Sequence, residues 1–383
     1  MSQLHATGET PSCRRHETST PSQTSAPSVR AGVFLEFVGE GRLVGRRILA
    51  LVLPGCLLAT STVYGHHSYA DYDRTRTVEI AGRLVSAAWE NPHSHLRVEV
   101  TDAGHTVTWE IDGGSLNNLR RAHAPLELYK VGDTVKVAGW PAKRGPGRLY
   151  GTNLLSADGQ ELVMLGNVKP RWTTKAFGLN GADSPLYTGG TPSDSDSIFR
   201  VWSSNFRDPD AGPDSLFKRT QLPLTAAAKA KAATNANRNV TTGCRPKGMP
   251  EIMAQPLPME LVDEGDTISV KLEEYDTVRT IHMGQSEEAA APSLLGYSRG
   301  RWEGKTLVVE TSDLSAEYLD HDGDPLSPSA RLLERFTVSP DGSRLNYVLT
   351  VTDPETFTEP VVLKRSWIWK PGEQVLPFNC AEP

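Results

Sequence analysis

Short stretches of alternating apolar and polar residues dominate the first half of this chain. Val78, Ile80 and Leu84 begin the pattern, and such alternation predicts strands with one buried face. Strands are expected in five segments, namely 75–84, 95–100, 106–111, 134–140 and 149–155. Between the third and the fourth, Ser115 can cap a short helix that carries Leu116 and Leu119 on one face. The order of three strands, one helix and two strands is that of the OB-fold, a small barrel.

The second half repeats the alternation in longer segments that are separated by turn-forming residues. Strands are expected over 267–273, 278–283, 306–311, 330–338, 344–352 and 361–369. A short helix over 226–233, with Thr225 as its cap, precedes the main sheet. The short connections favour an antiparallel, lipocalin-like β-barrel, and a β-sandwich is the alternative. The whole chain is therefore expected to be mostly β.

The segment between the two halves is rich in Gly, Ser, Pro and Asp, which is typical of a linker. We expect an OB-like domain over residues 66–166, a linker over 167–197 and a barrel domain over 198–383. Residues 1–43 are rich in Ser, Thr, Pro and Gly, which indicates a disordered extension or a misassigned start.

Residues 44–65 have the pattern of a signal peptide. Arg46 and Arg47 precede the apolar run 48–58, and cleavage is expected after Gly65. The run is interrupted by Pro54 and is shorter than the roughly 20 residues that span a bilayer, so no stable membrane span is expected. We expect an exported protein, periplasmic or secreted. Processing as a lipoprotein at Cys56 is the alternative.

Cysteine usage and charge limit the classes of function. Of four cysteines, only Cys244 and Cys380 follow the expected cleavage site, and a pair in an oxidising compartment predicts a disulfide. The net charge is −6 with no basic cluster, which does not favour a nucleic acid partner. Motifs typical of serine hydrolases, nucleotide-binding proteins and zinc proteases are absent from the sequence.

Four histidines are candidate metal ligands. His93 and His95 share a face of an extended strand, and His66 would become the mature N-terminus, followed by His67. Imidazoles bind copper and other divalent metals, and a terminal amine adds a further donor. The alternative is that all four are ordinary surface or terminal residues.

Charged residues inside the expected strands of the second barrel are the other candidates. Inward-facing charges must pair or bind a ligand. Three carboxylates are candidate catalytic groups, and three arginines with one tryptophan are candidate ligand-binding groups; the alternative is that they form structural ion pairs. The carboxylates are Glu303, Glu334 and Asp353, and the ligand-binding candidates are Arg279, Trp302, Arg335 and Arg365.

The first half resembles a domain family of unknown function from exported bacterial proteins. The resemblance lies in His66-His67-Ser68, in the segment 89–93 that ends in Asn-Pro-His, and in the segment 132–139 that begins with Gly-Asp. It implies no particular activity.

The second half resembles a poorly characterised module of secreted bacterial proteins. The matching segments are 244–250, 300–309, 334–336, 352–354 and 378–382. Tyr297 stands where that pattern usually has His, and His282 where it has Tyr.

Together these features predict an exported binding or accessory protein that takes a small apolar or amphipathic ligand into its second barrel. Two alternatives remain: copper or another divalent metal bound through His66 with His93 or His95, and a carboxylate-dependent enzyme in the second barrel. Neither the oligomeric state nor the ligand can be read from the sequence.

Overall fold

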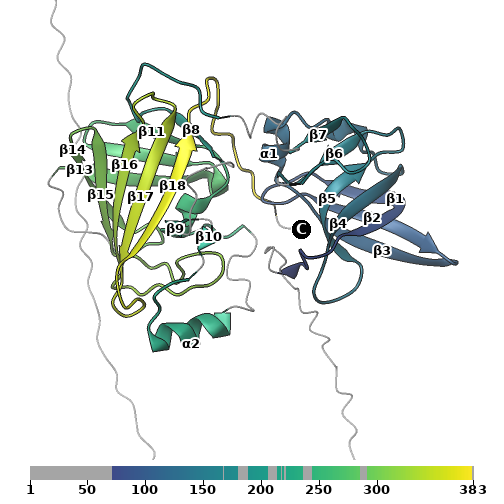
Figure 1. Ribbon diagram of the computed structural model, residues 1–383, viewed down its shortest axis with the longest axis horizontal. Helices are drawn as coiled ribbons and strands as arrows, with labels where there is room; N and C mark the ends of the chain where they lie inside the picture. The colour runs from purple at the N-terminus through teal and green to yellow at the C-terminus, as the bar shows by residue number, and fades with distance from the viewer. Residues whose placement is uncertain are drawn as a thin grey trace, which may run out of the picture. The chain divides into compact units, whose positions relative to one another are not determined.

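The computed structural model describes residues 71–166, 168–179, 189–205, 214–216, 218–219, 221–235, 244–284 and 291–381. The expected extension, the signal peptide and the two histidines His66 and His67 lie outside these residues. Among the described residues, strands predominate and form two separate barrels. The expected mostly-β fold with an OB-like barrel followed by a larger barrel is confirmed (Figure 1).

The first barrel has the strand pairing of an OB-fold. Strand β1 pairs with β2 and with β4, β2 pairs with β3, β4 pairs with β5, and a short parallel pairing of β3 with β5 closes the ring. The helix α1 follows β3, and the Ser115 side chain accepts a hydrogen bond from the N–H of Asn118, as expected of its cap. The elements are β1 (Val78–Ala88), β2 (His95–Asp102), β3 (His105–Asp112), α1 (Leu116–Arg121), a 3-10 turn (Leu126–Leu128), β4 (Thr134–Pro141) and β5 (Arg148–Leu155).

Two further strands extend this sheet beyond the closed ring. Strand β6 (Glu161–Val163) pairs with β5, and β7 (Ala176–Gly178) pairs with β6. The buried carboxylate of Glu161 accepts hydrogen bonds from the backbone N–H groups of residues 171, 172 and 173. Within the segment expected to be linker, residues 176–178 therefore belong to the first sheet as β7. Residues 171–173 are attached to it through the donors that the buried carboxylate requires.

The second barrel is a closed ring of nine strands (Figure 1). Neighbours along the chain pair in sequence from β11 to β18, and β8 pairs with both β11 and β18 to close the ring. The ring contains β8 (Val201–Ser204), β11 (Met259–Asp263), β12 (Thr267–Leu272), β13 (Thr277–Met283), β14 (Tyr297–Glu303), β15 (Thr306–Ser312), β16 (Arg331–Val338), β17 (Arg344–Thr352) and β18 (Val361–Ile368). Outside it lie β9 (Asp214–Ser215), β10 (Lys218–Arg219), α2 (Ala226–Asn235) and the 3-10 turns Glu251–Ala254 and Glu274–Asp276.

One pair in the second barrel runs parallel. Strands β13 and β14 pair in parallel, with Ile281 opposite Ser298, whereas the other pairs of the ring are antiparallel. A ring with an odd number of strands cannot alternate direction throughout. The barrel therefore departs from a strict up-and-down arrangement at the seam between β13 and β14.

A polar network lies inside the second barrel. Arg279 of β13 donates hydrogen bonds to both carboxylate oxygens of Glu334, to Ser298 Oγ at 2.9 Å and to Thr311 Oγ1 at 2.8 Å. The Tyr347 hydroxyl donates to Glu334 Oε1 at 2.8 Å. The side chains of Arg279 and Glu334 are 1% and 0% exposed. The network thus satisfies a fully buried ion pair with donors and acceptors from five strands.

A buried carboxylate also joins the second barrel to α1 and to the C-terminal tail, which we define as residues 370–381. Glu273, directly after β12, is fully buried. It accepts hydrogen bonds from Arg121 Nη1 at 2.7 Å, Asn117 Nδ2 at 2.9 Å and the N–H of Leu376 at 2.8 Å. Arg121 also donates to Glu373 at 2.9 Å. Burial acts to lower the pKa of Arg121, but the hydrogen bonds and charges of Glu273 and Glu373 outweigh it, so the pKa is raised.

The expected disulfide is present. The sulfur atoms of Cys244 and Cys380 are bonded, and the two residues are 136 positions apart in sequence. The bond ties the end of the C-terminal tail to the residues that precede the second barrel's first long hairpin.

We expect Arg279→Met to lower the free energy of unfolding by about 3–5 kcal/mol, because Glu334 would remain buried without its cationic partner. The matched control is Arg335→Met. Arg335 follows Glu334 on β16 but forms an exposed ion pair with Glu303. That control should change stability by less than about 1 kcal/mol. Urea unfolding followed by tryptophan fluorescence measures both, and equal losses would contradict the structural role of the buried pair.

A second substitution tests how much the ion pair between Arg121 and Glu273 contributes to stability. Arg121→Met should cost about 3–5 kcal/mol, because it leaves Glu273 buried with fewer donors. Arg120→Met is the control, since the neighbouring Arg120 is exposed on α1 and surface changes usually stay within about 0.5 kcal/mol. The same urea experiment compares the two variants, and similar midpoints for both would show that the Arg121 contact contributes little.

Candidate functional site

The three candidate catalytic carboxylates do not come together. Glu303 lies on the outside of the second barrel, is 41% exposed and pairs with Arg301 and Arg335. Glu334 lies inside the barrel in the network with Arg279. Asp353 accepts hydrogen bonds from the N–H and hydroxyl of Ser327 and from the N–H of Thr356, so it orders a turn. Each of the three candidate carboxylates has its own partners, and the structure does not bring them together.

The candidate ligand-binding residues are likewise separated. Arg365 is buried inside the barrel and donates to the carbonyl oxygens of Met253 and Gln255 and to Ser204 Oγ. Arg335 faces outward, and Trp302 is 45% exposed with its ring against the edge of Phe199. Arg279 is occupied by Glu334. Arg279 and Arg365 are buried within the barrel, whereas Arg335 and Trp302 lie on its exposed surface, so the four side chains do not line one shared cavity.

Of the two described histidine candidates, His95 is the first residue of β2 and His93 lies two residues before it. His93 Nδ1 is 3.2 Å from the carbonyl oxygen of Gly113, and His95 Nδ1 is 2.9 Å from Asp112 Oδ1. A carbonyl oxygen and a carboxylate only accept hydrogen bonds, so each Nδ1 must carry the proton. In the neutral ring the lone pair then lies on Nε2. Histidines that bind metals through Nε2 are commonly oriented by this kind of hydrogen bond at the other nitrogen.

Asp112 is the centre of this cluster. It accepts hydrogen bonds from His95 and from the hydroxyl of Tyr72, and Arg148 Nη2 lies 3.8 Å from its Oδ2. Burial acts to raise the pKa of Asp112, but the hydrogen bonds from His95 and Tyr72 outweigh it, so the pKa is lowered. Burial and the neighbouring Asp112 both raise the pKa of Tyr72. Asp112 is therefore held as a carboxylate and Tyr72 as a neutral phenol.

Aromatic rings pack around the histidines. Tyr150 meets the ring of His93 edge to face with a centroid distance of 6.0 Å, and the ring of Tyr72 at 5.6 Å. Arg148 donates to the Tyr72 hydroxyl at 3.1 Å and lies 5.7 Å from the centre of its ring. On one side, therefore, the cluster packs against Arg148 and Tyr150 of β5.

Sequence reasoning had singled out the histidines and missed their partners. Asp112 stands opposite His95 in the pairing of β2 with β3, so the register of that hairpin would have found it. Tyr72 follows His66 by six positions and lay just before the first expected strand. Among the described residues, no group of three or more His, Cys, Asp and Glu is arranged to hold a metal ion. A complete ligand set would need a further donor.

The fold and this cluster define a two-barrel protein whose OB barrel carries a histidine pair oriented by a carboxylate and a carbonyl. Residues 56–151 match the model of a family of unknown function, DUF6152. This match covers about a quarter of the chain, includes both histidines and Asp112, and is a similarity of the first barrel. A search of curated proteins found no match. No helix in the described part of the chain is long and apolar enough to cross a bilayer.

The lowered pKa of Asp112 has a consequence for acid stability. A carboxyl group whose pKa is lower in the folded than in the unfolded state stabilises the fold above the unfolded value of about 3.9, and this contribution is lost as the pH falls through the folded value. We therefore expect Asp112→Asn to be less stable than wild type at pH 7, with the difference shrinking below about pH 4. Urea unfolding between pH 7 and pH 3 measures it. Asp102→Asn, at the exposed end of β2, is the control; a gap for Asp112→Asn that stays constant with pH would contradict the assignment.

Proposed function

We propose that the first barrel binds a divalent transition metal, copper foremost, through Nε2 of His93 and of His95. The observation that carries the proposal is the pair of hydrogen bonds from the two Nδ1 atoms to Gly113 and Asp112. They orient both rings and favour the neutral tautomer in which Nε2 carries the lone pair that a metal ion would take. Imidazole nitrogen is a preferred ligand for copper, zinc and nickel.

The third donor in this proposal is His66, with His67 as the alternative. Tyr72 belongs to the cluster through Asp112, and it is only six positions from His66. An extended chain covers at most about 3.3–3.6 Å per residue, so either histidine is within reach of the site. Cleavage after Gly65 would add a terminal amine as a nitrogen donor. Export is part of the proposal, supported by the signal-like segment 44–65 and by the disulfide.

The small apolar or amphipathic ligand expected in the second barrel stays a prediction, as does a carboxylate-dependent enzyme. The buried side chains of Arg279, Glu334, Tyr347 and Arg365 already use their polar groups within the barrel. This arrangement favours a structural role for them, so we place the function in the first barrel.

Titration of the metal-free chain that begins at His66 tests the proposal. Wild type should bind one equivalent of Cu(II) or Zn(II), and His93→Ala or His95→Ala should weaken binding by at least about 10–100-fold, the loss seen when even an orienting partner is removed. His105→Ala is the matched control, because His105 is exposed on β3 of the same hairpin. Isothermal titration calorimetry and metal analysis after gel filtration give affinity and stoichiometry.

A chain that begins at Ser68 lacks both His66 and His67, so it measures their joint contribution to metal affinity. If these residues supply donors, this shortened chain should lose affinity while its far-ultraviolet circular dichroism stays unchanged. The proposal fails if wild type holds no stoichiometric metal, or if both substitutions in the pair leave the affinity as it was.

A further inference from the structure

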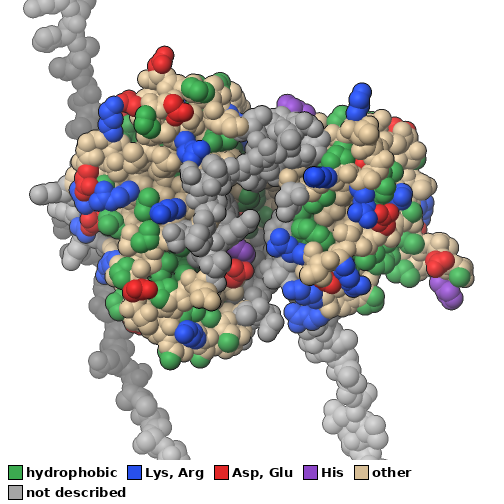
Figure 2. All heavy atoms as spheres, viewed as in Figure 1, with side chains coloured by type: hydrophobic (Ala, Val, Ile, Leu, Met, Phe, Trp, Pro, Cys, Tyr) green, Lys and Arg blue, Asp and Glu red, His purple; other side chains and the backbone are tan. Residues whose placement is uncertain are grey.

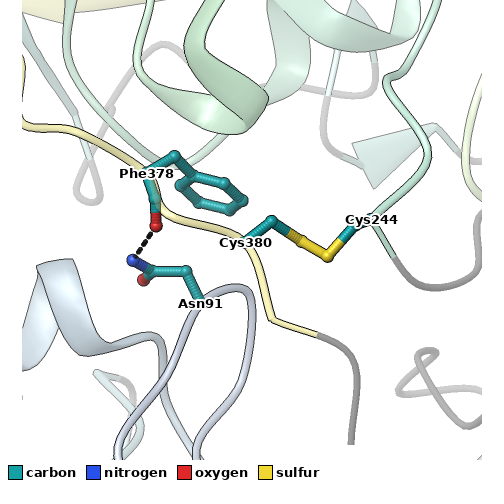
Figure 3. The surroundings of a disulfide bond; sticks show 4 residues. All are labelled: Asn91, Cys244, Phe378 and Cys380. Atoms are coloured by element: carbon teal, nitrogen blue, oxygen red, sulfur yellow. Dashed lines mark hydrogen bonds between the residues drawn. A yellow bond between two sulfur atoms is a disulfide. The ribbon is translucent and has the colours of Figure 1, made fainter.

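The disulfide bond lies against the loop that carries His93. Cys380 pairs with Asn91 in an isolated parallel bridge, and the N–H of Ala381 donates to the Asn91 carbonyl oxygen at 3.0 Å. The Asn91 side-chain amide donates to the carbonyl oxygen of Phe378 at 2.6 Å, and Figure 3 shows this bond beside the two sulfur atoms. Two residues later the same loop reaches His93.

The other side of the loop rests on α1. Asn91 Oδ1 accepts a hydrogen bond from the N–H of Asn117 at 3.1 Å, and the Glu90 carbonyl oxygen accepts one from the N–H of Leu116 at 2.9 Å. Asn117 in turn donates to the carbonyl oxygen of Pro377 at 3.2 Å. Asn91 is only 2% exposed. The loop is therefore held between α1 and the C-terminal tail.

Near its end the tail is held by the disulfide as well as by hydrogen bonds. Upstream, the tail is held by the contacts of Glu373 and Leu376 with Arg121 and Glu273. Beyond Phe378, the disulfide to Cys244 keeps the backbone of residues 380 and 381 against Asn91. Both cysteines are partly exposed, so a small thiol reagent can reach the bond while Asn91 itself is covered.

We propose that the Cys244–Cys380 disulfide is a redox-modification site that sets the metal affinity of the His93 and His95 pair. This inference rests on the proposed function. A dithiol reductant would cleave the bond in two exchange steps: its two S–H groups are oxidised to a disulfide, the protein S–S bond is reduced, and the two protons end on the thiols of Cys244 and Cys380. The reverse reaction with an oxidised dithiol restores the bond.

The two histidines should respond differently. His95 lies within β2 and pairs across the hairpin with Asp112, so it keeps its position when the tail is released. His93 lies in the loop that Asn91 anchors, and it loses the contact of residues 380 and 381 with Asn91. Phe378 keeps its place, because it is buried and its N–H donates to Asp276. Reduction therefore weakens the metal site through His93 and leaves a weaker site at His95.

The experiment compares oxidised protein with protein that has been reduced, alkylated with iodoacetamide and freed of reagents. Titration with Cu(II) or Zn(II) should give an affinity about tenfold weaker for the alkylated form, the size expected when support for a ligand is lost. Hydrogen–deuterium exchange should rise in residues 90–95 and 376–381. The Cys244→Ser/Cys380→Ser variant should match the alkylated protein and be insensitive to the treatment.

Asn91→Ala with the disulfide intact is the second variant, and it removes the side-chain link to Phe378 without touching the cysteines. It should show the same loss of affinity, with little further loss on reduction. If the reduced protein unfolds in circular dichroism, this variant decides the matter, and wild-type affinity in it would overturn the inference.

The remaining outcomes separate this inference from the proposed function. If oxidised wild type binds no metal, the metal site is refuted, and the exchange data alone decide whether the disulfide restrains the loop. If wild type binds metal with the same affinity in both redox states, and exchange in residues 90–95 is unchanged, the redox site is refuted and the metal site stands.

Discussion

The carboxylate of Glu273 is the interaction on which the arrangement of the C-terminal tail depends. A buried carboxylate costs several kcal/mol unless it is paired and hydrogen-bonded. Its donors come from α1 through Arg121 and Asn117 and from the tail through Leu376. If either segment moved away, the buried carboxylate would lose hydrogen-bond donors, and loss of α1 would also remove its cationic partner Arg121. Because the tail is held there, Cys380 is brought to Cys244 and the backbone of the tail end is brought to Asn91.

The second barrel uses the same principle in its interior. Leu332, Glu334 and Phe336 alternate on β16, and the apolar neighbours of Glu334 place it inside. Arg279 reaches it from β13, at the seam where the pairing turns parallel. The ion pair thus connects the strands on both sides of the seam through Ser298 and Thr311. Arg279 and Glu334, which were candidate site residues in the sequence, thus form an ion pair that links these strands. On the face in view in Figure 2, by contrast, acidic and basic side chains are interspersed.

Local patterns in the sequence were sufficient to predict the fold class. The features that they did not predict depend on contacts between residues far apart in the sequence. Alternation predicted the OB order, Ser115 and Thr225 were recognised as caps that accept hydrogen bonds from Asn118 and Ala228, and the cysteine count gave the disulfide. Strand β14 was not among the expected segments, because Gly300 and the charged residues beside it interrupt the alternation. Residues 171–173 are attached to the first sheet through Glu161, and no local pattern reveals that a carboxylate will be buried. That Glu334 faces the barrel interior and Arg335 the exterior could have been predicted from β16 alone, because adjacent residues of a strand face opposite sides of the sheet.

In the candidate site, the histidines could be predicted from the sequence, but the groups that orient them could not. His93 and His95 share a face by spacing alone, but the groups that orient them come from the far end of β3, where Asp112 and Gly113 follow each other. The same two adjacent residues therefore orient both imidazole rings, but different contacts hold the backbone of each histidine. His95 is fixed by the ladder of β2 with β3, and His93 by a loop whose anchor, Asn91, touches α1 and the tail. In the proposed metal site one histidine would therefore be held by a strand and the other by a loop, and the loop is the one that contacts the residues at the disulfide.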